Sequence, residues 1–493
     1  MDTFLFKLGQ GSSVVLVATF LLSSNTLVQA QTESELQQGG NINESIIPKK
    51  LSIYRTNLIA DKQVIQSQSI ESTTPPAPSQ NRESTVTVSK EEFDLLKTKV
   101  DDFSAEILSL KSLNSRNSKQ NNFSITTKLV GEGIVGFSGY GGVTETATRL
   151  GNNNVFSDRI RLNFDTSFIG KDRLRTRLQS RNTTPFNAAV TGTNMTRMGY
   201  DGNDGENNTL VSLFQYDLPL SEQTKIRIAT VGYEFNDNQP TLNPLLASSG
   251  TGSISRFGRF NPIFRLSGDG ASINVSQKLG DQLSLDLGYA VPANGASTAA
   301  NPAPSNGLFN GQNSILSQLT YTPSKDLSLA LLYGRSYNNA GGLTGGTGSA
   351  AANNPFGGTT PTSANHYSFL ASYKLGDTAT ISGWAGFIDA KRETAAGGSA
   401  GISNYAVTLG FSDFGAKGNT LGFVFGIPPK LNSLSTATTT GNPDTSLHLE
   451  ALYKVKVTDN IDITPGLLLI TNPEHNSANA TAYVGTVRTT FRF

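Results

Sequence analysis

Apolar and polar residues alternate with a period of two from Phe123 to the C-terminus. This is the spacing of β-strands whose two faces meet different surroundings. In residues 445–456, for example, Leu447 and Leu449 alternate with His448 and Glu450. One face of such a strand suits lipid and the other suits water, so the pattern favours a membrane barrel.

The alternating region divides into sixteen stretches, each long enough to cross a bilayer as a tilted strand. A closed barrel would satisfy all of their backbone hydrogen bonds within the hydrocarbon layer. The predicted strands are 123–138, 155–169, 172–181, 209–218, 222–235, 269–279, 282–290, 312–322, 326–335, 366–375, 378–388, 402–411, 418–426, 445–456, 459–470 and 481–493.

The connections between these stretches alternate in length. Short turns follow every second strand, at Gly170-Lys171, Gly280-Asp281, Pro323-Ser324-Lys325 and Gly376-Asp377. The other connections are Gly-, Asn- and Ser-rich and long, as in 182–208, 236–268 and 336–365. We therefore predict an all-β fold: a sixteen-stranded antiparallel transmembrane β-barrel over 123–493, with periplasmic turns, external loops and both barrel ends on the turn side.

Three segments precede the barrel. Residues 1–30 predict a signal peptide, because an apolar stretch from Val14 to Leu22 is followed by the small-residue site Val28-Gln29-Ala30. A membrane anchor is the alternative, but the stretch is too short to span. Residues 31–88 are polar, contain Pro75, Pro76 and Pro78, and predict a disordered linker.

Residues 89–114 predict a periplasmic coiled-coil helix. Ser89 and Glu92 form a capping box at its start. Apolar residues then follow with spacings of three and four, which is the seam of a coiled coil. The alternative is an amphipathic helix packed on the same chain. The predicted oligomerisation seam consists of Phe93, Leu96, Val100, Phe103, Ile107 and Leu110.

Composition narrows the functional classes. The 493 residues include no Cys and three His, 16% are charged, and the net charge is +1. Disulfides, thiolate metal sites and Cys nucleophiles are excluded, and no strong positive field points to nucleic acid. The histidines His366, His448 and His475 lack metal-ligand spacing. We expect no catalytic residue, no metal site and no cofactor.

Two motifs could suggest ligand sites. GEGIVG at 131–136 matches a dinucleotide-binding pattern by letter, but it lies within a predicted strand rather than between a strand and a helix. Asp201, Asn203, Asp204 and Glu206 could bind calcium, although a solvated loop tip explains them better.

Arginines alternate with apolar residues on neighbouring predicted strands. Because lipid burial of an arginine costs about 2–4 kcal/mol near the midplane, we assign them to the lumen. The alternative is a generic polar lumen in which acids on opposite strands balance them. The candidate pore-lining residues are Arg159, Arg161, Arg173, Arg175, Arg177 and Arg227 on strands, and Arg256, Arg259 and Arg265 in the third long loop.

Several blocks resemble a known family. They are GSISRFGRFNPIFR at 252–265, GLFNG at 307–311, LGFVFG at 421–426, PDTSLHLE at 443–450, ITPG at 463–466, ITNPEH at 470–475 and TVRTTFRF at 486–493. Over residues 89–493 the chain is similar to cyanobacterial outer-membrane porins of the carbohydrate-selective (OprB-type) family, often called iron-uptake porins. The resemblance implies a sixteen-stranded trimer whose third loop folds into the lumen. It also implies an S-layer-homology domain before the coiled coil, which residues 31–88 do not show.

The sequence thus predicts a homotrimeric outer-membrane porin of a Gram-negative-type, cyanobacterial cell. Carbohydrates, inorganic ions or iron would diffuse passively through it, without catalysis. Its partners would be outer-membrane lipid and the barrel-assembly machinery, which would read Phe491 and Phe493 as the assembly signal. Two alternatives are a structural protein that tethers the envelope and an enzyme housed in a barrel.

Overall fold

The computed structural model describes residues 126–142, 153–293, 298–339, 342–435 and 441–493, with separate positions between Lys90 and Asp102. The chain divides into two units, Met1–Lys99 and Val100–Phe493. The described positions of the first unit, among them Lys90 and Asp94, are helical and exposed. The predicted seam residues lie outside the described residues. None of the described helices has the length and apolarity of a membrane-crossing helix.

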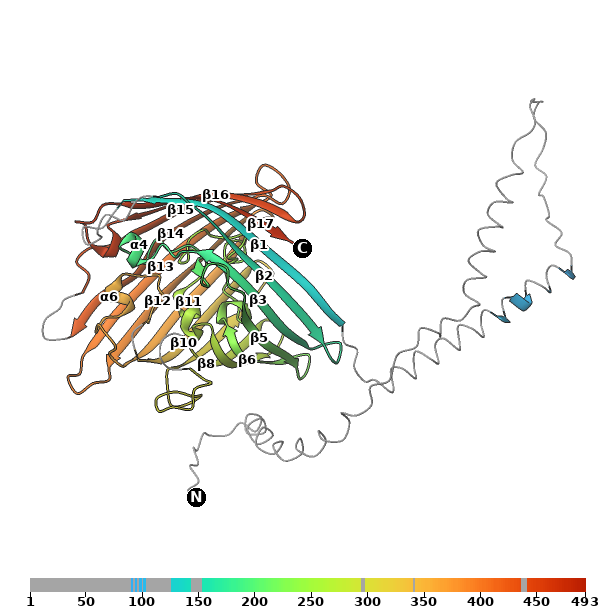
Figure 1. The fold of residues 1–493 in the computed structure, drawn as a ribbon, viewed down its shortest axis with the longest axis horizontal. Coiled ribbons are helices and arrows are strands. Elements are labelled where there is room, and N and C mark those ends of the chain that lie inside the picture. The colour runs from blue at the N-terminus through green and yellow to red at the C-terminus, as the bar shows by residue number, and fades with distance from the viewer. Residues whose placement is uncertain are drawn as a thin grey trace, which may run out of the picture. The chain divides into compact units, whose positions relative to one another are not determined.

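The second unit contains a closed barrel of sixteen antiparallel strands (Figure 1). Strands β1 and β17 pair from Glu132↔Arg492 to Gly141↔Tyr483 and thereby close the wall. A short strand, β4 (Gly202–Asn203), pairs with β3 outside the main sheet. The wall consists of β1 (Thr126–Gly141), β2 (Val155–Ser167), β3 (Arg173–Thr183), β5 (Leu210–Pro219), β6 (Thr224–Tyr233), β7 (Gly270–Lys278), β8 (Leu283–Val291), β9 (Asn313–Tyr321), β10 (Leu327–Asn338), β11 (Thr362–Leu375), β12 (Ala379–Arg392), β13 (Ser399–Ser412), β14 (Thr420–Ser435), β15 (Leu447–Lys456), β16 (Ile461–Thr471) and β17 (Ala482–Arg492).

The number, order and pairing of the strands confirm the predicted barrel. GEGIVG at 131–136 lies within β1, as expected. The predicted alternation of connection lengths is wrong at one hairpin. The loop between β12 and β13 spans only 393–398, whereas the turn between β13 and β14 spans 413–419. The cause is that β12 and β13 are 14 residues each and stay paired up to Lys391↔Ser399, which leaves a tight connection.

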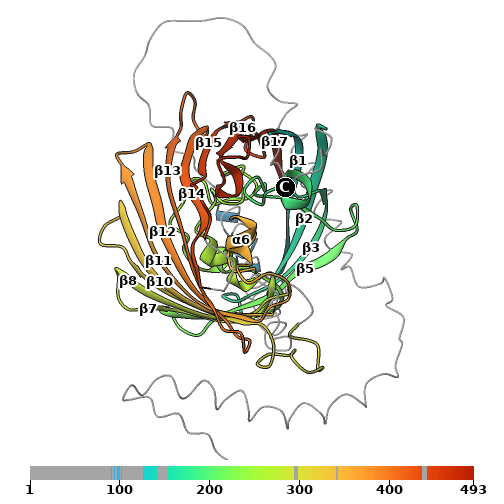
Figure 2. The same cartoon turned by 90° about the vertical axis from the view of Figure 1, so that its left-hand side faces the viewer.

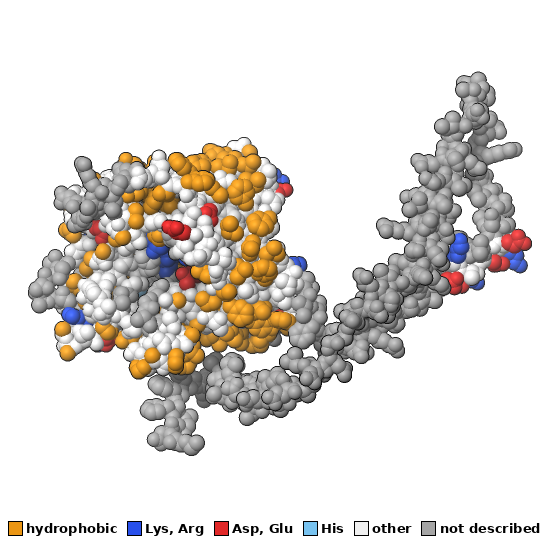
Figure 3. All heavy atoms as spheres, viewed as in Figure 1, with side chains coloured by type: hydrophobic (Ala, Val, Ile, Leu, Met, Phe, Trp, Pro, Cys, Tyr) orange, Lys and Arg blue, Asp and Glu red, His pale blue; other side chains and the backbone are white. Residues whose placement is uncertain are grey.

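The two faces of the wall differ as the period of two requires. On β17, Tyr483 and Val487 point outward and are exposed, while Thr486, Arg488 and Thr490 are buried on the inner face. Figure 3 shows apolar side chains over much of the outer wall. The exposed outer set includes Phe137, Phe156, Ile160, Leu319, Leu331, Phe369, Phe387, Val407, Phe425 and Leu467.

Long loops fold into the barrel and fill much of its interior (Figure 2). We number the loops along the chain: loop 2 is 184–209, loop 3 is 234–269, loop 5 is 339–361, loop 7 is 436–446 and loop 8 is 472–481. Their short helices, which the sequence did not predict, are α4 (Ala188–Thr191), α5 (Phe235–Asn238), η1 (Pro262–Ser267), α6 (Ala350–Asn353) and η2 (Pro473–His475). Buried apolar side chains of loops 2 and 3, such as Met198 and Phe257, pack against inward residues of the wall.

Candidate functional site: an arginine-lined constriction

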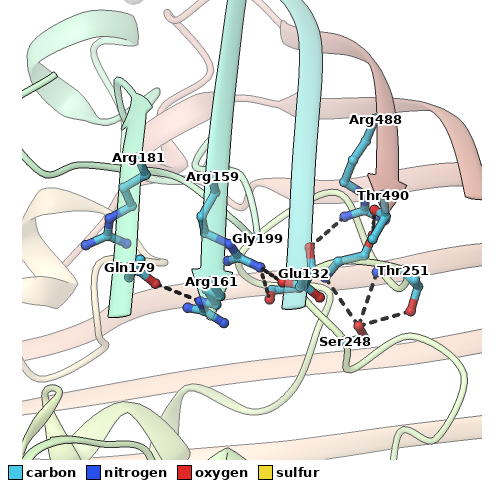
Figure 4. Close-up of polar contacts among 12 residues, drawn as sticks. Glu132, Arg159, Arg161, Gln179, Arg181, Gly199, Ser248, Thr251, Arg488 and Thr490 are labelled. Atoms are coloured by element: carbon cyan, nitrogen blue, oxygen red, sulfur yellow. Dashed lines mark hydrogen bonds and ion pairs between the residues drawn. The ribbon is translucent and has the colours of Figure 1, made fainter. Parts of the chain in front are cut away.

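Loop 3 crosses the interior and is fixed to β17, which lies five strands along the wall from β6. The guanidinium of Arg488 on β17, labelled in Figure 4, donates to two carbonyls of loop 3. These are the carbonyls of Gly252 at 2.6 Å and Ser249 at 3.0 Å. Arg488 is fully buried. The Thr490 hydroxyl next to it donates to the Gly250 carbonyl at 2.6 Å. Loop 3 therefore has a defined path through the lumen, as the family resemblance implied.

A second anchor comes from Glu450 on β15. Its carboxylate accepts hydrogen bonds from the Ile254 N–H at 2.6 Å and from the Ser253 hydroxyl at 2.8 Å. His448, two residues away on the same face, lies 3.4 Å from the carboxylate. Hydrogen bonds to an ionised acceptor are about twice as strong as neutral ones, so this anchor holds the middle of the loop firmly.

Between loop 3 and the wall lies a cavity of about 510 Å³, which we call the wall cavity. Arg159 and Arg161 enter it from β2, and Arg177 and Arg181 enter it from β3 (Figure 4 shows all but Arg177). Alternation along the strand brings these side chains to one face, and the β2–β3 register places Arg161 opposite Gln179. The wall cavity thus has a basic side made by two adjacent strands.

Two of these arginines form no ion pair with any described residue. Arg161 donates to the Gln179 amide oxygen at 2.7 Å, and Arg177 donates to the Asn163 amide oxygen at 2.8 Å. Their positive charges are therefore not neutralised at contact distance and act on the cavity. Arg159 differs, because Glu132 on β1 accepts from it at 2.7 Å.

Carboxylates on the loop side face this basic surface. Glu234, Asp237 and Asp269 line the wall cavity and flank the two ends of loop 3. Burial opposes ionisation of Glu234, but Arg259 and nearby arginines outweigh it and bring the pKa to about 2. Desolvation by the surrounding loops and the negative charge of Glu234 raise the pKa of Asp269 to about 6, although its side chain remains accessible to water. The constriction thus pairs a permanent carboxylate with one that titrates near neutrality.

A second cavity of about 430 Å³, the loop cavity, lies among loops 2, 3 and 5. Six residues line both cavities, so the two spaces adjoin. Together they are lined by eight arginines and five acids, an excess of positive charge. The shared residues are Arg181, Asp201, Glu234, Asn236, Arg256 and Asp269.

The three loop arginines bond mainly to backbone; Arg259 and Arg265 are buried, and Arg256 is partly buried. Arg256 donates to the Gly345 carbonyl of loop 5 at 3.0 Å, and Arg265 donates to the Arg256 carbonyl at 2.7 Å. The guanidiniums of Arg259 and Arg265 lie 4.8 and 4.5 Å from the centre of the Phe260 ring. Burial lowers the pKa of Arg256 to about 10, so it stays charged at neutral pH.

The remaining strand candidates lie outside both cavities and near the turn end of the strands. Arg173 pairs with Asp217 at 2.6 Å, and Arg175 pairs with Asp165 at 2.6 Å. Arg227 donates to the Ser276 hydroxyl at 2.7 Å. The structure therefore separates the predicted set. Arg159, Arg161, Arg177, Arg256, Arg259 and Arg265 come together at the constriction, and Arg173, Arg175 and Arg227 do not.

The expectation of a solvated loop tip at 201–206 is wrong for two of its acids. Asp201 is buried and accepts from Arg197 at 2.8 Å, and Asp204 accepts from Arg181 at 2.9 Å. Loop 2 turns inward and bridges to loop 3 through Met198 and Ser255, which carries these acids into the lumen. Sequence reasoning also missed Glu234, Asp237 and Asp269. Their positions beside Tyr233 and Gly270, at strand ends flanking the third loop, were the available signal.

The terminal aromatics and His448 lie on the faces that the alternation predicts. Phe491 and Phe493 are exposed on the outer face, and the Phe493 N–H donates to the Gly131 carbonyl across the closing strands. Two of the histidines contact hydroxyl groups. His366 lies 3.0 Å from the Ser336 hydroxyl, and His448 lies 3.2 Å from the Ser255 hydroxyl.

A closed sixteen-stranded barrel with an inward third loop is the architecture of a porin. The carbohydrate-selective porin, OprB family, matches residues 112–493 of this chain. The chain belongs to this porin family. The family and the barrel fold are those of outer-membrane channels rather than of enzymes.

Relatives of this porin occur in cyanobacteria. An uncharacterized protein of Synechocystis is 37% identical over 444 residues, covering 83% of this chain and 78% of that protein. An uncharacterized protein of Nostoc is 32% identical over 437 residues, covering 82% and 73% of the two chains. Pseudomonas putida OprB at high pH is a similar solved structure, with a TM-score of 0.50 and 11% identity over 77% of this porin and 96% of that chain. At this identity the structural likeness shows the fold alone.

Proposed function

We propose that this porin conducts small hydrophilic solutes passively, and that it favours anions while also admitting neutral sugars. The observation that supports the proposal is the pair of unneutralised arginines, Arg161 and Arg177, in the wall cavity. Fixed arginines in a pore favour anions. Acids face them, and water and salt screen them, so the preference is moderate.

Neutral sugars suit the same surface. Arginine guanidiniums donate hydrogen bonds to hydroxyl oxygens, and carboxylates accept them from hydroxyl hydrogens. Arg161 and Glu234 both line the wall cavity and supply the two kinds of group. Free ferric ion would be repelled by the arginines, so iron would enter as a chelate or by slow leakage. Carbohydrates and inorganic ions are thus the proposed solutes.

The proposed setting is a homotrimer in the outer membrane of a cyanobacterial cell. The apolar outer face meets lipid, the seven turns face the periplasm and the eight loops face outward. The signal peptide directs export, and the barrel-assembly machinery reads the Phe491 and Phe493 end. The Phe93 to Leu110 seam holds protomers together on the periplasmic side.

Liposome swelling tests the proposal. Vesicles that contain the purified porin should swell in isotonic solutions of small sugars, at rates that fall as the sugar grows. Iron uptake in a deletion strain, measured beside the parent strain, tests the ionic part. Absence of swelling with every sugar and of ion current in bilayers would contradict a channel and favour the tethering role.

A further inference from the structure

Loop 8 contains a run of strained backbone in the ITNPEH segment. Asn472, Glu474 and His475 have φ values of 46°, 60° and 55°. A non-glycine residue in this left-handed region is strained, because its Cβ lies too close to the following carbonyl oxygen. Such strain persists only where surrounding contacts hold it, and it concentrates at functional segments. The contacts of this segment therefore indicate what the strained conformation serves.

The Glu474 carboxylate joins two other loops. It accepts from the Thr193 hydroxyl of loop 2 at 2.5 Å and from the Ala350 N–H of loop 5 at 2.6 Å. Oε1 accepts from Thr193 and Oε2 accepts from Ala350, so each carboxylate oxygen binds a different loop. Burial raises the pKa of Glu474, but the two donors oppose that effect. The three loops thus meet at a single side chain.

Neighbouring contacts fix Glu474 itself. The Asn442 amide of loop 7 donates to the Glu474 carbonyl at 3.2 Å, and the Ser349 hydroxyl donates to the Asn442 amide oxygen at 3.0 Å. The His475 ring is buried and accepts from the Ser446 N–H at 2.8 Å. The carboxylate is therefore held on a rigid support.

On the loop 2 side, the contact leads to the constriction. Thr193 is fully buried and precedes Arg197, which pairs with Asp201 and lines the loop cavity. The Arg197 carbonyl accepts from the Arg256 N–H at 2.7 Å, which ties loop 2 to loop 3. Movement of Thr193 would therefore displace two residues that line the passage.

On the loop 5 side, the contact between Glu474 and Ala350 also connects to the lining of the loop cavity. Ala350 is the first residue of α6, and Asn353 is the last. The Asn353 amide oxygen accepts from the Gly346 N–H at 3.0 Å, and the adjacent Gly345 carbonyl accepts from Arg256 at 3.0 Å. Both glycines line the loop cavity.

We propose that Glu474 is a positioning residue for the constriction, a clasp that holds loops 2 and 5 inward and so limits the size of solute that passes. The clasp is the set Glu474, Thr193 and Ala350. The limit on solute size rests on the proposed channel function, whereas the holding of the loops does not. The two parts are tested separately.

Hydrogen exchange on the folded porin tests the holding. Glu474→Gln removes the negative charge: the amide oxygen can still accept from the Ala350 N–H and the amide NH2 faces the Thr193 hydroxyl, so both charge-assisted bonds are replaced by weaker neutral ones. Amides of 193–201 and 342–353 should exchange about tenfold faster or more, because a hydrogen bond to a charged group contributes about 1.5–3 kcal/mol. The matched control is Glu393→Gln, since exposed Glu393 accepts from a single serine, Ser363. Unchanged exchange in Glu474→Gln would overturn the clasp.

Variants of the two donors test the loop 2 contact and the loop 5 contact separately. Thr193→Val removes the loop 2 donor and should release 193–201 alone, while Thr193→Ser should restore protection. Ala350→Pro removes the loop 5 donor at the first helical position, where proline is tolerated, and should release 342–353 alone. These changes spare the acid, so they decide the question even if Glu474→Gln folds poorly. If hydrogen exchange is unchanged in both 193–201 and 342–353, the proposal is overturned.

Conduction tests the size limit. In planar bilayers Glu474→Gln should show higher single-channel conductance, and in vesicles it should admit larger sugars than the unchanged porin. If the unchanged porin conducts nothing, the channel function fails while hydrogen exchange still decides whether loops 2 and 5 are held. If the unchanged porin conducts and Glu474→Gln has the same conductance and size limit, the clasp fails as a determinant of passage.

Discussion

Arg159 on β2 connects two separate parts of the barrel through one nitrogen. Its Nη2 donates to the Glu132 carboxylate on β1 at 2.7 Å and to the Ser249 hydroxyl of loop 3 at 2.9 Å. Arg159 is 2% exposed, and the Glu132 carboxylate is the group that compensates its buried positive charge. The pair therefore supports both the wall and the position of loop 3.

The first prediction concerns that ion pair. Glu132→Gln should lower the free energy of unfolding by roughly 3 kcal/mol, because a buried charge that loses its partner is strongly destabilising. Urea unfolding followed by the change in electrophoretic mobility would measure it. Glu393→Gln, at an exposed loop position, should change stability little. Equal stability of Glu132→Gln and the parent would show that Arg159 does not depend on Glu132.

The second prediction concerns topology. Single cysteines at exposed positions of loop 2 or loop 5, such as Asn208 and Thr359, should react with an impermeant thiol reagent added to intact cells, because loops face outward in the proposed orientation. The parent contains no Cys, so labelling would be specific. Cysteines at Gly280 and Gly376, in short turns, should react only after the outer membrane is permeabilised. The reverse pattern would invert the orientation.

The third prediction is a pH dependence. Asp269 has a pKa of about 6, so it is charged above that pH and neutral below it. Lowering the pH through 6 removes one negative charge from the constriction, and anion preference should increase. Glu234, with a pKa of about 2, stays ionised, and Asp237, whose pKa is also raised, would add to the same change. Reversal potentials at pH 7.5 and pH 5 would measure the shift.

The control for this effect is Asp269→Asn, which should show a smaller pH response than the parent, because only Asp237 still titrates in this range. A pH response of unchanged size in that variant would assign the titration to another group.

The fourth prediction concerns the N-terminal seam. Changing Val100 and Ile107 to Asp would place charges in the predicted coiled coil and should weaken the oligomer, since unpaired buried charges are costly. Size-exclusion chromatography with light scattering would report the state. The isolated 89–114 peptide should self-associate. If the peptide is monomeric and the Val100→Asp, Ile107→Asp variant keeps its oligomeric state, the coiled coil is contradicted and the barrel walls alone would hold the oligomer together.

The period of two was enough to predict the strands and their faces, because alternation is a local property of the chain. It could not predict how far each inward side chain lies from the turn end of the barrel. Arg175 and Arg177 belong to the same alternating pattern, yet only Arg177 lines the wall cavity. Arg175 lies nearer the turns, where it pairs with Asp165. This distance depends on register between strands, which local spacing does not specify.

The inward loops were also beyond sequence reasoning. Asp201 reads as part of a polar loop, but the Met198–Ser255 bridge and the Arg197 pair carry it into the lumen. Glu450 reads as one more inward polar residue, and its partners in loop 3 are about 200 residues away. Such contacts depend on which loop fills the interior. The family resemblance predicted that loop, but the alternation of residues did not.

The central claim is a conducting pore whose selectivity comes from unneutralised arginines. The most direct measurement is the reversal potential of single channels in a planar bilayer under a salt gradient. The account predicts moderate anion selectivity, strongest at low salt, where the Debye length exceeds about 10 Å. Arg161→Gln with Arg177→Gln should reduce it, whereas Arg173→Gln with Arg175→Gln should change it less, because those two arginines line neither the wall cavity nor the loop cavity and lie nearer the turns. A cation-selective parent, or equal effects of the two double variants, would contradict the account.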